Sequence, residues 1–389
     1  MSGLFDPIIS EEGVVRPTHL EIQLGQIVDN YHHIQQRVGV GCDVMAILKA
    51  NAYGHGMLEV ARTLQARGCR HLGLAYLEEG IRLRQAGIQL PILILGGIIG
   101  SQIPLFLRYN LSITASSIDK LRAIDECAQA HGCRASVHLK IDTGMERIGV
   151  HYYSASKLLD FSLGCKHVDV KGIFSHFANA DAEDLSHARL QLERFLEVLD
   201  FYRQRSLPTP LRHIANSGAI LQLPESYLDM VRPGLLLFGY APSEQLQQRV
   251  ATLLDVRPAL RWVSRVVYFK VVQPNHPVSY GSTWESDHMV RVVTIPVGYG
   301  DGYHRRMSGQ ARLLIGGQRY PVVGSICMDQ IMVNIEWNEA YNGDEVVLLG
   351  EQGEHSIGLH EMARWAQTIP YEILTSINTR VPRVYREKE

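Results

Sequence analysis

The clearest candidate for chemistry in this sequence is Lys49, which closes the short apolar run Val44–Leu48. Apolar runs of this length, bounded by turn residues, are typical of buried parallel strands. A lysine is rarely buried without a partner, so Lys49 either ends its strand in solvent or is desolvated there. A desolvated lysine has a lowered pKa and can form a Schiff base with a carbonyl compound. Tyr53 and the turn Gly54–Gly56, which follow, suit the binding of a phosphate group.

Strand and helix patterns alternate from residue 43 to about residue 240. The expected strands are Asp43–Lys49, His71–Tyr76, Pro91–Gly96, Leu111–Ser116, Ala135–Asp142, Val168–His176, Leu211–Asn216 and Met230–Phe238. Amphipathic helical patterns between them include Met57–Arg67, Glu78–Ala86, Ile118–His131 and Leu185–Arg205. This alternation predicts parallel βαβ units, and about eight strands close a (β/α)8 barrel. An open doubly wound sheet remains an alternative, although no GxGxxG motif follows the first strand.

Several polar residues fall at the carboxyl ends of these strands, where barrel enzymes place their active sites. They are Lys49, Asp142 with Arg147, His176, Asn216 with Ser217, and Arg232 with Gly234. Singly, each has an ordinary structural explanation, such as a core histidine, a helix N-cap or a surface cation. Their joint position at one rim instead predicts a site. Ser217 and the backbone N–H groups of Gly234 and Leu235 would bind a phosphate there.

The pattern changes after residue 243. The expected strands become Leu260–Val272, Met289–Val297, Ala311–Ile315, Arg319–Val323, Gln330–Ile335 and Glu345–Leu349, followed by a helix at Gly358–Gln367. Short strands separated by turns predict a mainly antiparallel β domain. We place the boundary near residue 250, with a barrel domain over residues 1–250 and a β domain over residues 251–389. The alternating run Thr18–Leu24 would be a ninth strand, so we assign it to the β domain.

The composition is that of an ordinary soluble globular protein, with 46% hydrophobic and 20% charged residues among 389. The formal net charge is −2, and no basic cluster points to nucleic acid or to a membrane surface. The N-terminal segment lacks the features of a secretory signal, and the longest apolar run, Pro91–Ile99, is too short to span a bilayer. Six cysteines without metal-ligand spacing predict reduced thiols, no metal site and a cytoplasmic location.

Ten segments resemble the motifs of the alanine racemase family, in the family's order and across both expected domains. They are LKANAYGHG (48–56), KIDTGMERIG (140–149), FSHFANAD (174–181), ANSGA (215–219), VRPGLLLFG (231–239), VSYG (278–281), GYGDG (298–302), GSICMDQ (324–330), PYE (370–372) and RVPRVY (380–385). The resemblance implies an isomerase that interconverts L-alanine and D-alanine with pyridoxal phosphate, and that supplies D-alanine for peptidoglycan.

The resemblance also implies roles for particular residues. Lys49 would bind pyridoxal phosphate covalently and act as one catalytic base. Tyr280, from the β domain of a second subunit in a homodimer with shared active sites, would be the other. The implied cofactor-binding residues are Tyr53, His176, Asn216, Ser217, Arg232, Gly234, Leu235 and Tyr371. Arg147 and the backbone of Met328 would hold the carboxylate of the amino-acid substrate.

Two further positions bear on the resemblance. Lys140 lies where family members can carry a carbamylated lysine that orients the arginine. Ser325 departs from the family pattern, in which an arginine is common before the Ile-Cys-Met-Asp run. We therefore expect the charge along the substrate corridor to differ.

The expected chemistry follows from what racemisation requires: a proton leaves one face of Cα and another returns to the opposite face. Two bases on opposite faces, here Lys49 and Tyr280, meet that requirement. The hydroxyl of a tyrosine ordinarily has a pKa of about 10, so it needs a neighbouring hydrogen-bond donor in order to act as a base at neutral pH. His176, which would touch Arg232, is the expected donor. Arginine keeps its proton, so opposite the pyridine nitrogen Arg232 favours a racemase over an aminotransferase.

Other functions remain open at this point. A serine or broad-specificity racemase shares these motifs, since a small pocket rejects serine by only about 1–3 kcal/mol. A related pyridoxal-phosphate decarboxylase would carry an acidic residue in place of Arg232. A non-catalytic pyridoxal-phosphate-binding barrel would have no use for Tyr280 and Met328. A cofactor-free barrel enzyme acting on phosphorylated substrates would be colourless.

Overall fold

The computed structural model describes residues 9–10 and 13–387, with side chains from Val15 onward. The chain divides into two compact units. The barrel unit comprises residues 27–52 and 57–257, and the β unit comprises residues 1–26, 53–56 and 258–389.

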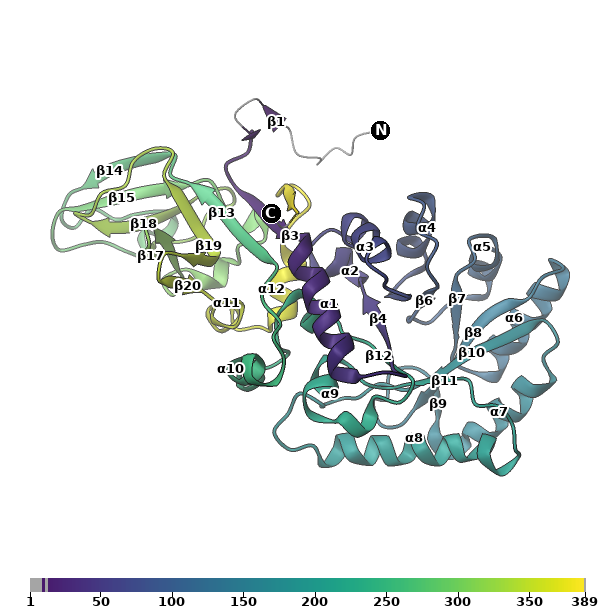
Figure 1. Cartoon of the computed structure of the whole chain (residues 1–389). Helices are drawn as coiled ribbons and strands as arrows, with labels where there is room; N and C mark the ends of the chain where they lie inside the picture. The colour runs from purple at the N-terminus through teal and green to yellow at the C-terminus, as the bar shows by residue number, and fades with distance from the viewer. Residues whose placement is uncertain (1–8, 11–12, 388–389) are drawn as a thin grey trace. The chain divides into compact units, whose positions relative to one another are not determined.

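The barrel unit is built on eight parallel strands that form a nearly closed barrel (Figure 1). In sheet order they are β12 (Met230–Val231), β4 (Asp43–Ile47), β5 (His71–Leu74), β6 (Ile92–Ile94), β7 (Ser112–Ala115), β8 (Ala135–Asp142), β10 (Val168–Phe174) and β11 (Leu211–His213). A short strand, β9 (Val150–His151), pairs with β8. The N–H of Arg232 donates to the carbonyl of Ala215 at 2.9 Å and brings the two ends of the sheet together. The predicted barrel is confirmed.

Helices follow the strands and cover the barrel. They are α1 (Leu24–Val38), of which residues 27–38 belong to this unit, α3 (Met57–Ala66), α4 (Leu77–Gln85), α5 (Ile103–Arg108), α6 (Ile118–Ala130), α7 (Ala155–Gly164), α8 (Ser186–Gln204), α9 (Ser217–Gln222) and α10 (Glu244–Leu253). Each long helix is amphipathic; α8, for example, buries Leu192, Phe195 and Leu199. The strands are largely buried because helices cover their outer surface and side chains fill the barrel interior.

Seven of the eight expected barrel strands are shorter than the sequence pattern predicts, Ala135–Asp142 being the exception, and two of the differences have a clear local cause. The expected strand Met230–Phe238 ends at Val231, because Pro233 has no N–H to donate, and residues 235–238 form a 3-10 helix. The expected strand Asp43–Lys49 ends at Ile47. Lys49 instead begins the short helical segment α2 (Lys49–Tyr53).

The β unit contains a ten-stranded, mainly antiparallel sheet (Figure 1). Along the sheet the strands are β14 (Tyr268–Val272), β15 (Val290–Ile295), β18 (Ile331–Glu336), β17 (Gln318–Val323), β16 (Arg312–Ile315), β19 (Glu345–Gln352), β13 (Leu260–Arg265), β3 (His19–Gln23) and β21 (Arg383–Arg386), while β20 (His355–Ile357) pairs with β19. Two helices, α11 (Leu359–Ala366) and α12 (Pro370–Ser376), complete the unit, and β1 (Ile9–Ser10) pairs with β2 (Gly13–Val14). The expected strand Leu260–Val272 is divided, since β13 pairs with β19 and β3 whereas β14 pairs with β15.

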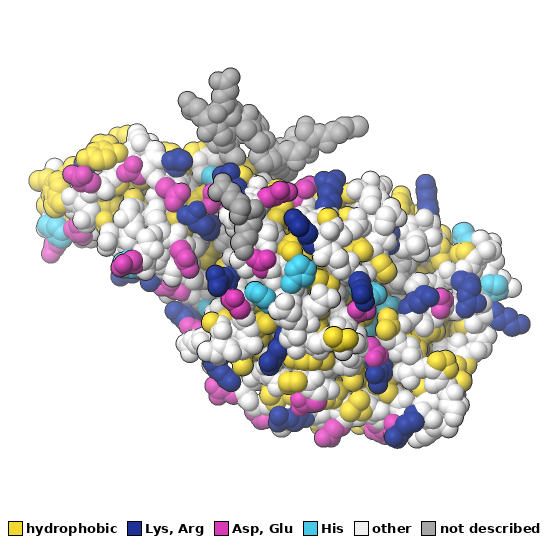
Figure 2. All heavy atoms as spheres, viewed as in Figure 1, with side chains coloured by type: hydrophobic (Ala, Val, Ile, Leu, Met, Phe, Trp, Pro, Cys, Tyr) yellow, Lys and Arg dark blue, Asp and Glu magenta, His cyan; other side chains and the backbone are white. Residues whose placement is uncertain are grey.

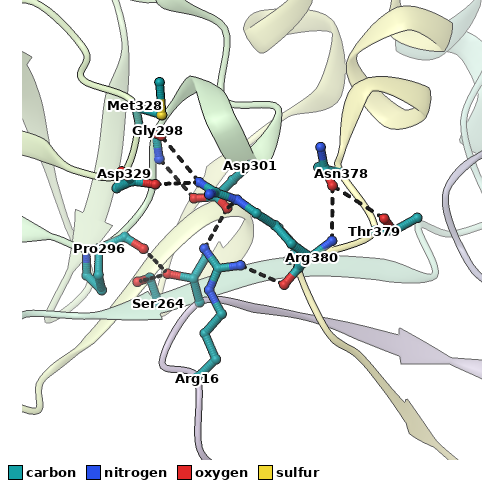
Figure 3. A network of polar contacts seen from close by, with 12 residues as sticks. Arg16, Ser264, Pro296, Gly298, Asp301, Met328, Asp329, Asn378, Thr379 and Arg380 are labelled. Carbon is teal, nitrogen blue, oxygen red and sulfur yellow. Dashed lines mark hydrogen bonds and ion pairs between the residues drawn. The ribbon is translucent and has the colours of Figure 1, made fainter. Parts of the chain in front are cut away.

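A buried carboxylate ties the two ends of the chain into the β unit (Figure 3). Asp301 is 0% exposed and accepts from Arg16 Nη2 at 2.5 Å and from Arg380 Nε at 2.7 Å. Arg380 also donates to the carboxylate of Asp329 at 2.8 Å and to the carbonyl of Met328 at 3.4 Å. The network therefore links the segments that precede β3 and β21 to the loop that carries Met328 (Figure 3).

Replacing Asp301 by alanine is expected to destabilise the β unit by about 3 kcal/mol, because two arginines would lose the carboxylate that compensates their partial burial. All four tryptophans of the chain lie in the β unit, so tryptophan fluorescence during urea unfolding reports on this unit alone. Asp329→Ala is the matched control. Asp329 is largely exposed, and its ion pair should contribute less than about 1 kcal/mol. Equal losses for both variants would contradict the prediction.

The surface of the β unit carries an apolar patch on its edge strand β14. Tyr268, Phe269 and Val271 are exposed there, and Figure 2 shows hydrophobic side chains gathered in the region of this strand. Within residues 9–10 and 13–387, no helix has both the length and the apolar character required to cross a bilayer.

Candidate active site

Lys49 lies where β4 ends, next to the segment that follows β12. The N–H of Ile47 donates to the carbonyl of Pro233 at 3.1 Å, and the N–H of Leu48 donates to that of Gly73. The next three residues, 50–52, adopt left-handed helical angles with φ between 52° and 55°. Because none of them is glycine, this backbone is costly, and such strain concentrates at functional sites.

Glu79 holds the start of that left-handed turn. Its Oε1 accepts from the N–H of Ala50 at 2.8 Å. Its Oε2 accepts from the N–H groups of Ala75 and Tyr76 at 2.8 and 3.2 Å. One carboxylate thus fastens the ends of β4 and β5 together beside Lys49.

The electrostatic surroundings of Lys49 favour its neutral amine. Burial is the main cause of its lowered pKa, and the positive charges of Arg147 and Arg232 lower it further. The negative charge of Glu79 opposes them in part. A lysine that loses its proton more easily than usual is a better nucleophile and a better base.

Arg232, 4% exposed, organises the polar groups around it. Its Nη1 donates to His213 Nδ1 at 2.9 Å. Its Nη2 donates to the carbonyl of Ser175 at 2.8 Å and to His176 Nδ1 at 3.1 Å. Burial lowers the pKa of Arg232, but a guanidinium starts so high that it stays charged at neutral pH.

The two histidines that accept from Arg232 are neutral. Burial, followed by the charge of Arg232, holds the pKa of His176 and that of His213 well below the usual value. Since arginine can only donate, Nδ1 of each ring is the acceptor and Nε2 carries the hydrogen. The Nε2–H of His213 then donates to His138 Nδ1 at 2.9 Å, while the Nε2–H of His176 can serve an oxygen in the site.

Ser217 and Gly234 lie against each other at the start of α9. Ser217 Oγ accepts from the N–H of Gly234 at 3.0 Å and from that of Leu236 at 3.3 Å, so its hydroxyl hydrogen is available to an anion. Asn216 is the N-cap of α9, its side chain accepting from the N–H of Ala219. The side chain of Asn216 therefore caps the helix, which is one of the structural roles that the sequence suggested for such residues.

Arg147 follows β8 in a loop shaped by Asp142. The carboxylate of Asp142 accepts from the N–H groups of Gly144, Met145, Glu146 and Arg147. Burial alone would raise the pKa of Asp142, but the hydrogen bonds from the loop backbone outweigh it and lower the pKa. The carboxylate therefore remains charged and fixes the backbone from which the Arg147 side chain extends.

Lys140, unlike the half-buried Lys49, is a fully buried lysine of the barrel unit. Its Nζ donates to the carbonyl of Ile141 at 2.8 Å and lies 5.2 Å from the centre of the Phe174 ring. Burial is the main cause that lowers the pKa of Lys140 to about 7. At neutral pH its amine is therefore partly unprotonated and able to react.

Four of the residues implied in the site lie in the β unit. Tyr53 and Tyr371 form a ring pair with centroids 6.1 Å apart, and burial raises the pKa of Tyr53, which keeps its hydroxyl protonated. Tyr280 and Met328 are exposed by 71% and 53% in the chain. The loop of Met328 packs against the GYGDG segment, where the N–H of Gly300 donates to the carbonyl of Met328 at 2.9 Å.

The structure therefore gathers Lys49, Arg147, His176, Ser217, Arg232 and Gly234 on the barrel unit, and Tyr53 and Tyr371 on the β unit. Sequence reasoning missed His213 and Glu79. The strand pattern of residues 211–216 could have placed His213 inside the barrel. No local signal would have linked Glu79, in α4, to the N–H of Ala50.

These features define a class of two-domain barrel enzymes. One domain is a nearly closed parallel barrel with a lysine of lowered pKa at the carboxyl end of its first strand, and the other is a separate β domain. The family model "Alanine racemase, N-terminal domain" matches residues 22–242, and "Alanine racemase, C-terminal domain" matches residues 259–385. The chain belongs to the alanine racemase family.

Individual relatives agree with this assignment. The alanine racemase of Carboxydothermus hydrogenoformans is 43% identical over 95% of this chain and 100% of its own length. That of Chlorobaculum tepidum is 42% identical over 93% of this chain and 94% of its own. Among solved structures, alanine racemase from Clostridium difficile is 34% identical, with a TM-score of 0.89 over 96% of this chain and 97% of its own. The enzyme from Bacillus anthracis with bound L-Ala-P is 32% identical, with a TM-score of 0.87 over 96% and 95%.

Proposed function

We propose that this protein is a pyridoxal-phosphate-dependent racemase that interconverts L-alanine and D-alanine. The observation that carries the proposal is the cluster at the barrel rim: Lys49 with a lowered pKa, beside a buried, charged Arg232 that is fixed by two neutral histidines. The relatives named above are alanine racemases over nearly the full length of both chains, which supports the same activity here.

The donors present suit the cofactor. The hydroxyl of Ser217 and the backbone at Gly234 and Leu235 would hold its phosphate, together with Tyr53 and Tyr371. Arg232 would face the pyridine nitrogen, with His176 beside the ring. When bound, pyridoxal phosphate withdraws electrons from Cα of the amino acid and makes its hydrogen acidic.

The residues of the chain would then move and place protons. Lys49 Nζ would hold the cofactor covalently between turnovers; its amine, set free when the amine of the substrate takes its place, would exchange a proton with Cα on one face. The hydroxyl oxygen of Tyr280 would exchange a proton on the other face. His176 can donate its Nε2–H to that oxygen, because its Nδ1 already accepts from Arg232. Arg147 and the backbone of Met328 would hold the substrate carboxylate.

We further propose that the enzyme is a homodimer in which Tyr280 and Met328 of one subunit complete the site of the other. The exposure of both side chains in the single chain supports this arrangement, as does the apolar patch on β14. Lys140 would carry a carbamate that orients Arg147; its lowered pKa supports such a reaction. The product would supply peptidoglycan synthesis, and the free thiols of the chain suit a cytoplasmic protein.

The decisive experiment combines a spectrum with a chiral assay. The purified protein should show a visible absorbance band from cofactor bound to a lysine, and it should convert each enantiomer of alanine into the racemate. L-serine, assayed in parallel, measures the substrate specificity. A preference for alanine over serine of about 1–3 kcal/mol corresponds to a ratio of kcat/KM values of roughly 10- to 200-fold. A colourless, inactive protein that cannot be reconstituted with pyridoxal phosphate would refute the proposal.

Replacing Arg232 by glutamate is expected to change the outcome of the reaction, since a carboxylate would let the pyridine nitrogen hold a proton. The ratio of pyruvate formed to alanine racemised should rise roughly tenfold, or ~1.4 kcal/mol in relative barrier. Coupled pyruvate detection beside the chiral assay measures it. Arg232→Lys, which keeps the positive charge, is the matched control and should leave this ratio near that of the wild type. An unchanged ratio in the glutamate variant would mean that Arg232 does not face the nitrogen.

A further inference from the structure

The backbone that carries Tyr280 is strained on both sides of the residue. Ser279 has φ 70° and ψ −179°, a conformation that is essentially confined to glycine. Gly281 has φ 76° and Ser282 has φ 50°. Such angles persist only where surrounding contacts over-determine them, so the contacts that hold this segment should be identifiable.

Two serines supply those contacts in a reciprocal arrangement. The hydroxyl of Ser325 donates to the carbonyl of Tyr280 at 2.8 Å. The hydroxyl of Ser279 donates to the carbonyl of Ser325 at 2.6 Å. Each serine therefore holds the backbone of the other segment, one hydrogen bond on each side of the peptide that joins Ser279 to Tyr280.

The two segments approach each other closely at Gly324. This glycine has φ +67°, and a Cβ added to it would lie 2.6 Å from the carbonyl oxygen of Val278 and 2.8 Å from Cβ of Ser279. Any side chain at position 324 would push the segments apart. The Ser325 side chain is buried in this contact, at 7% exposure, and is thus directed toward the Tyr280 loop and away from solvent.

We propose that Ser325 and Ser279 are positioning residues that fix the Tyr280 backbone, and through it the direction of the Tyr280 phenol. The proposal rests on the proposed function, in which Tyr280 is one of two bases. It also gives a role to Ser325, at a position where the family commonly has arginine. A longer side chain there would lack the short hydroxyl donor that reaches the carbonyl of Tyr280.

The expected effect of Ser325→Ala is a loss of kcat, because a base displaced by about 1 Å can cost on the order of 10²-fold. KM for alanine and the visible absorbance of the bound cofactor should stay close to those of the wild type, since the variant touches neither group. The kcat–pH profile should move to higher pH, because a misplaced phenol loses the hydrogen bond expected from His176. Ser325→Thr keeps the hydroxyl and should restore most of the activity.

Ser279→Ala removes the other half of the contact and should reproduce the same pattern. The double variant should lose little more than either single variant, because the two hydrogen bonds act as one unit. If Ser325→Ala does not fold, Ser279→Ala still tests the proposal. The matched control is Ser308→Ala: Ser308 Oγ accepts from the N–H of Ile326 at 3.0 Å, so it supports the same loop without contacting Tyr280.

The possible outcomes separate this proposal from the proposed function. Wild-type kcat in Ser325→Ala and Ser279→Ala, with Tyr280→Phe inactive, would overturn the positioning role alone. Full activity in Tyr280→Phe would overturn the role of Tyr280 as a base, and the positioning role with it. Equal losses in Ser308→Ala and Ser325→Ala, without a shifted pH profile, would reduce both serines to general support of the loop.

Discussion

Replacing Lys49 by alanine is expected to abolish racemisation and to remove the visible absorbance of the bound cofactor, while the protein remains folded. The variant loses both the covalent attachment and one base, and a general base alone commonly contributes about 10² to 10⁴ in rate. Chiral analysis of the product and a spectrum of the dialysed protein measure both effects. Circular dichroism checks that the fold is retained. Lys171→Ala, at an exposed lysine of β10, is the matched control and should behave as the wild type.

A chemical experiment distinguishes Lys49 from Lys140, the buried lysine of the barrel unit. Borohydride reduction of the holoenzyme fixes the cofactor on the lysine that holds it, and peptide mapping then identifies that residue. Lys140 is the strongest competitor, because burial lowers its pKa to about 7. Label on the peptide that contains Lys49 is expected. Label on Lys140 would mean that the buried lysine of β8 holds the cofactor instead.

The second large effect is expected from mixed dimers. Lys49→Ala and Tyr280→Phe should each be nearly inactive, because each site would lose one of its two bases. If a site takes Lys49 from one subunit and Tyr280 from the other, a mixed dimer contains one intact site and one doubly damaged site. Random association makes about half of the dimers mixed, so about a quarter of the wild-type activity should return.

The experiment requires dimers that are known to contain one subunit of each variant. The two variants should be co-expressed with different affinity tags, and dimers that carry both tags should be isolated and assayed; because each of them has one intact site of two, they should show about half of the wild-type activity. A mixture of the purified variants, without subunit exchange, is the control and should stay inactive. If verified mixed dimers show no activity, Tyr280 and Lys49 act within one chain, and the shared-site arrangement must be abandoned.

The barrel could be predicted because its strands and helices are specified by patterns of neighbouring residues. Each strand is a short apolar run ended by turn residues, and each helix has an amphipathic period, so residues 43 to 240 specify repeated βαβ units. The errors also have local causes that outweighed the hydrophobic pattern. Pro233 ends β12 at Val231, and the left-handed turn that begins at Ala50 leaves Lys49 outside β4.

Long-range contacts could not be predicted in the same way. The division of the run Leu260–Val272 into β13 and β14 depends on partners that lie far away along the chain. No strand is predicted at Arg383–Arg386, because β21 is defined by its pairing with β3 and not by a local pattern. The hydrogen bond from Ser325 to Tyr280 joins residues 45 positions apart, and the family pattern suggested only a change of charge at that position.

The position of β3 between β13 and β21 means that the β unit can be completed only after the barrel unit has been synthesised. Residues 57–257 are continuous in sequence, and the partners of every barrel strand have been translated once α10 is made. One edge of β3, in contrast, stays without its partner until Arg383–Arg386, about 360 positions later in the chain, are translated. Arg16 likewise waits for Asp301 and Arg380. The nascent chain must therefore keep β3 from pairing elsewhere while the barrel unit and most of the β unit are made, a period in which exposed strand edges are prone to aggregate.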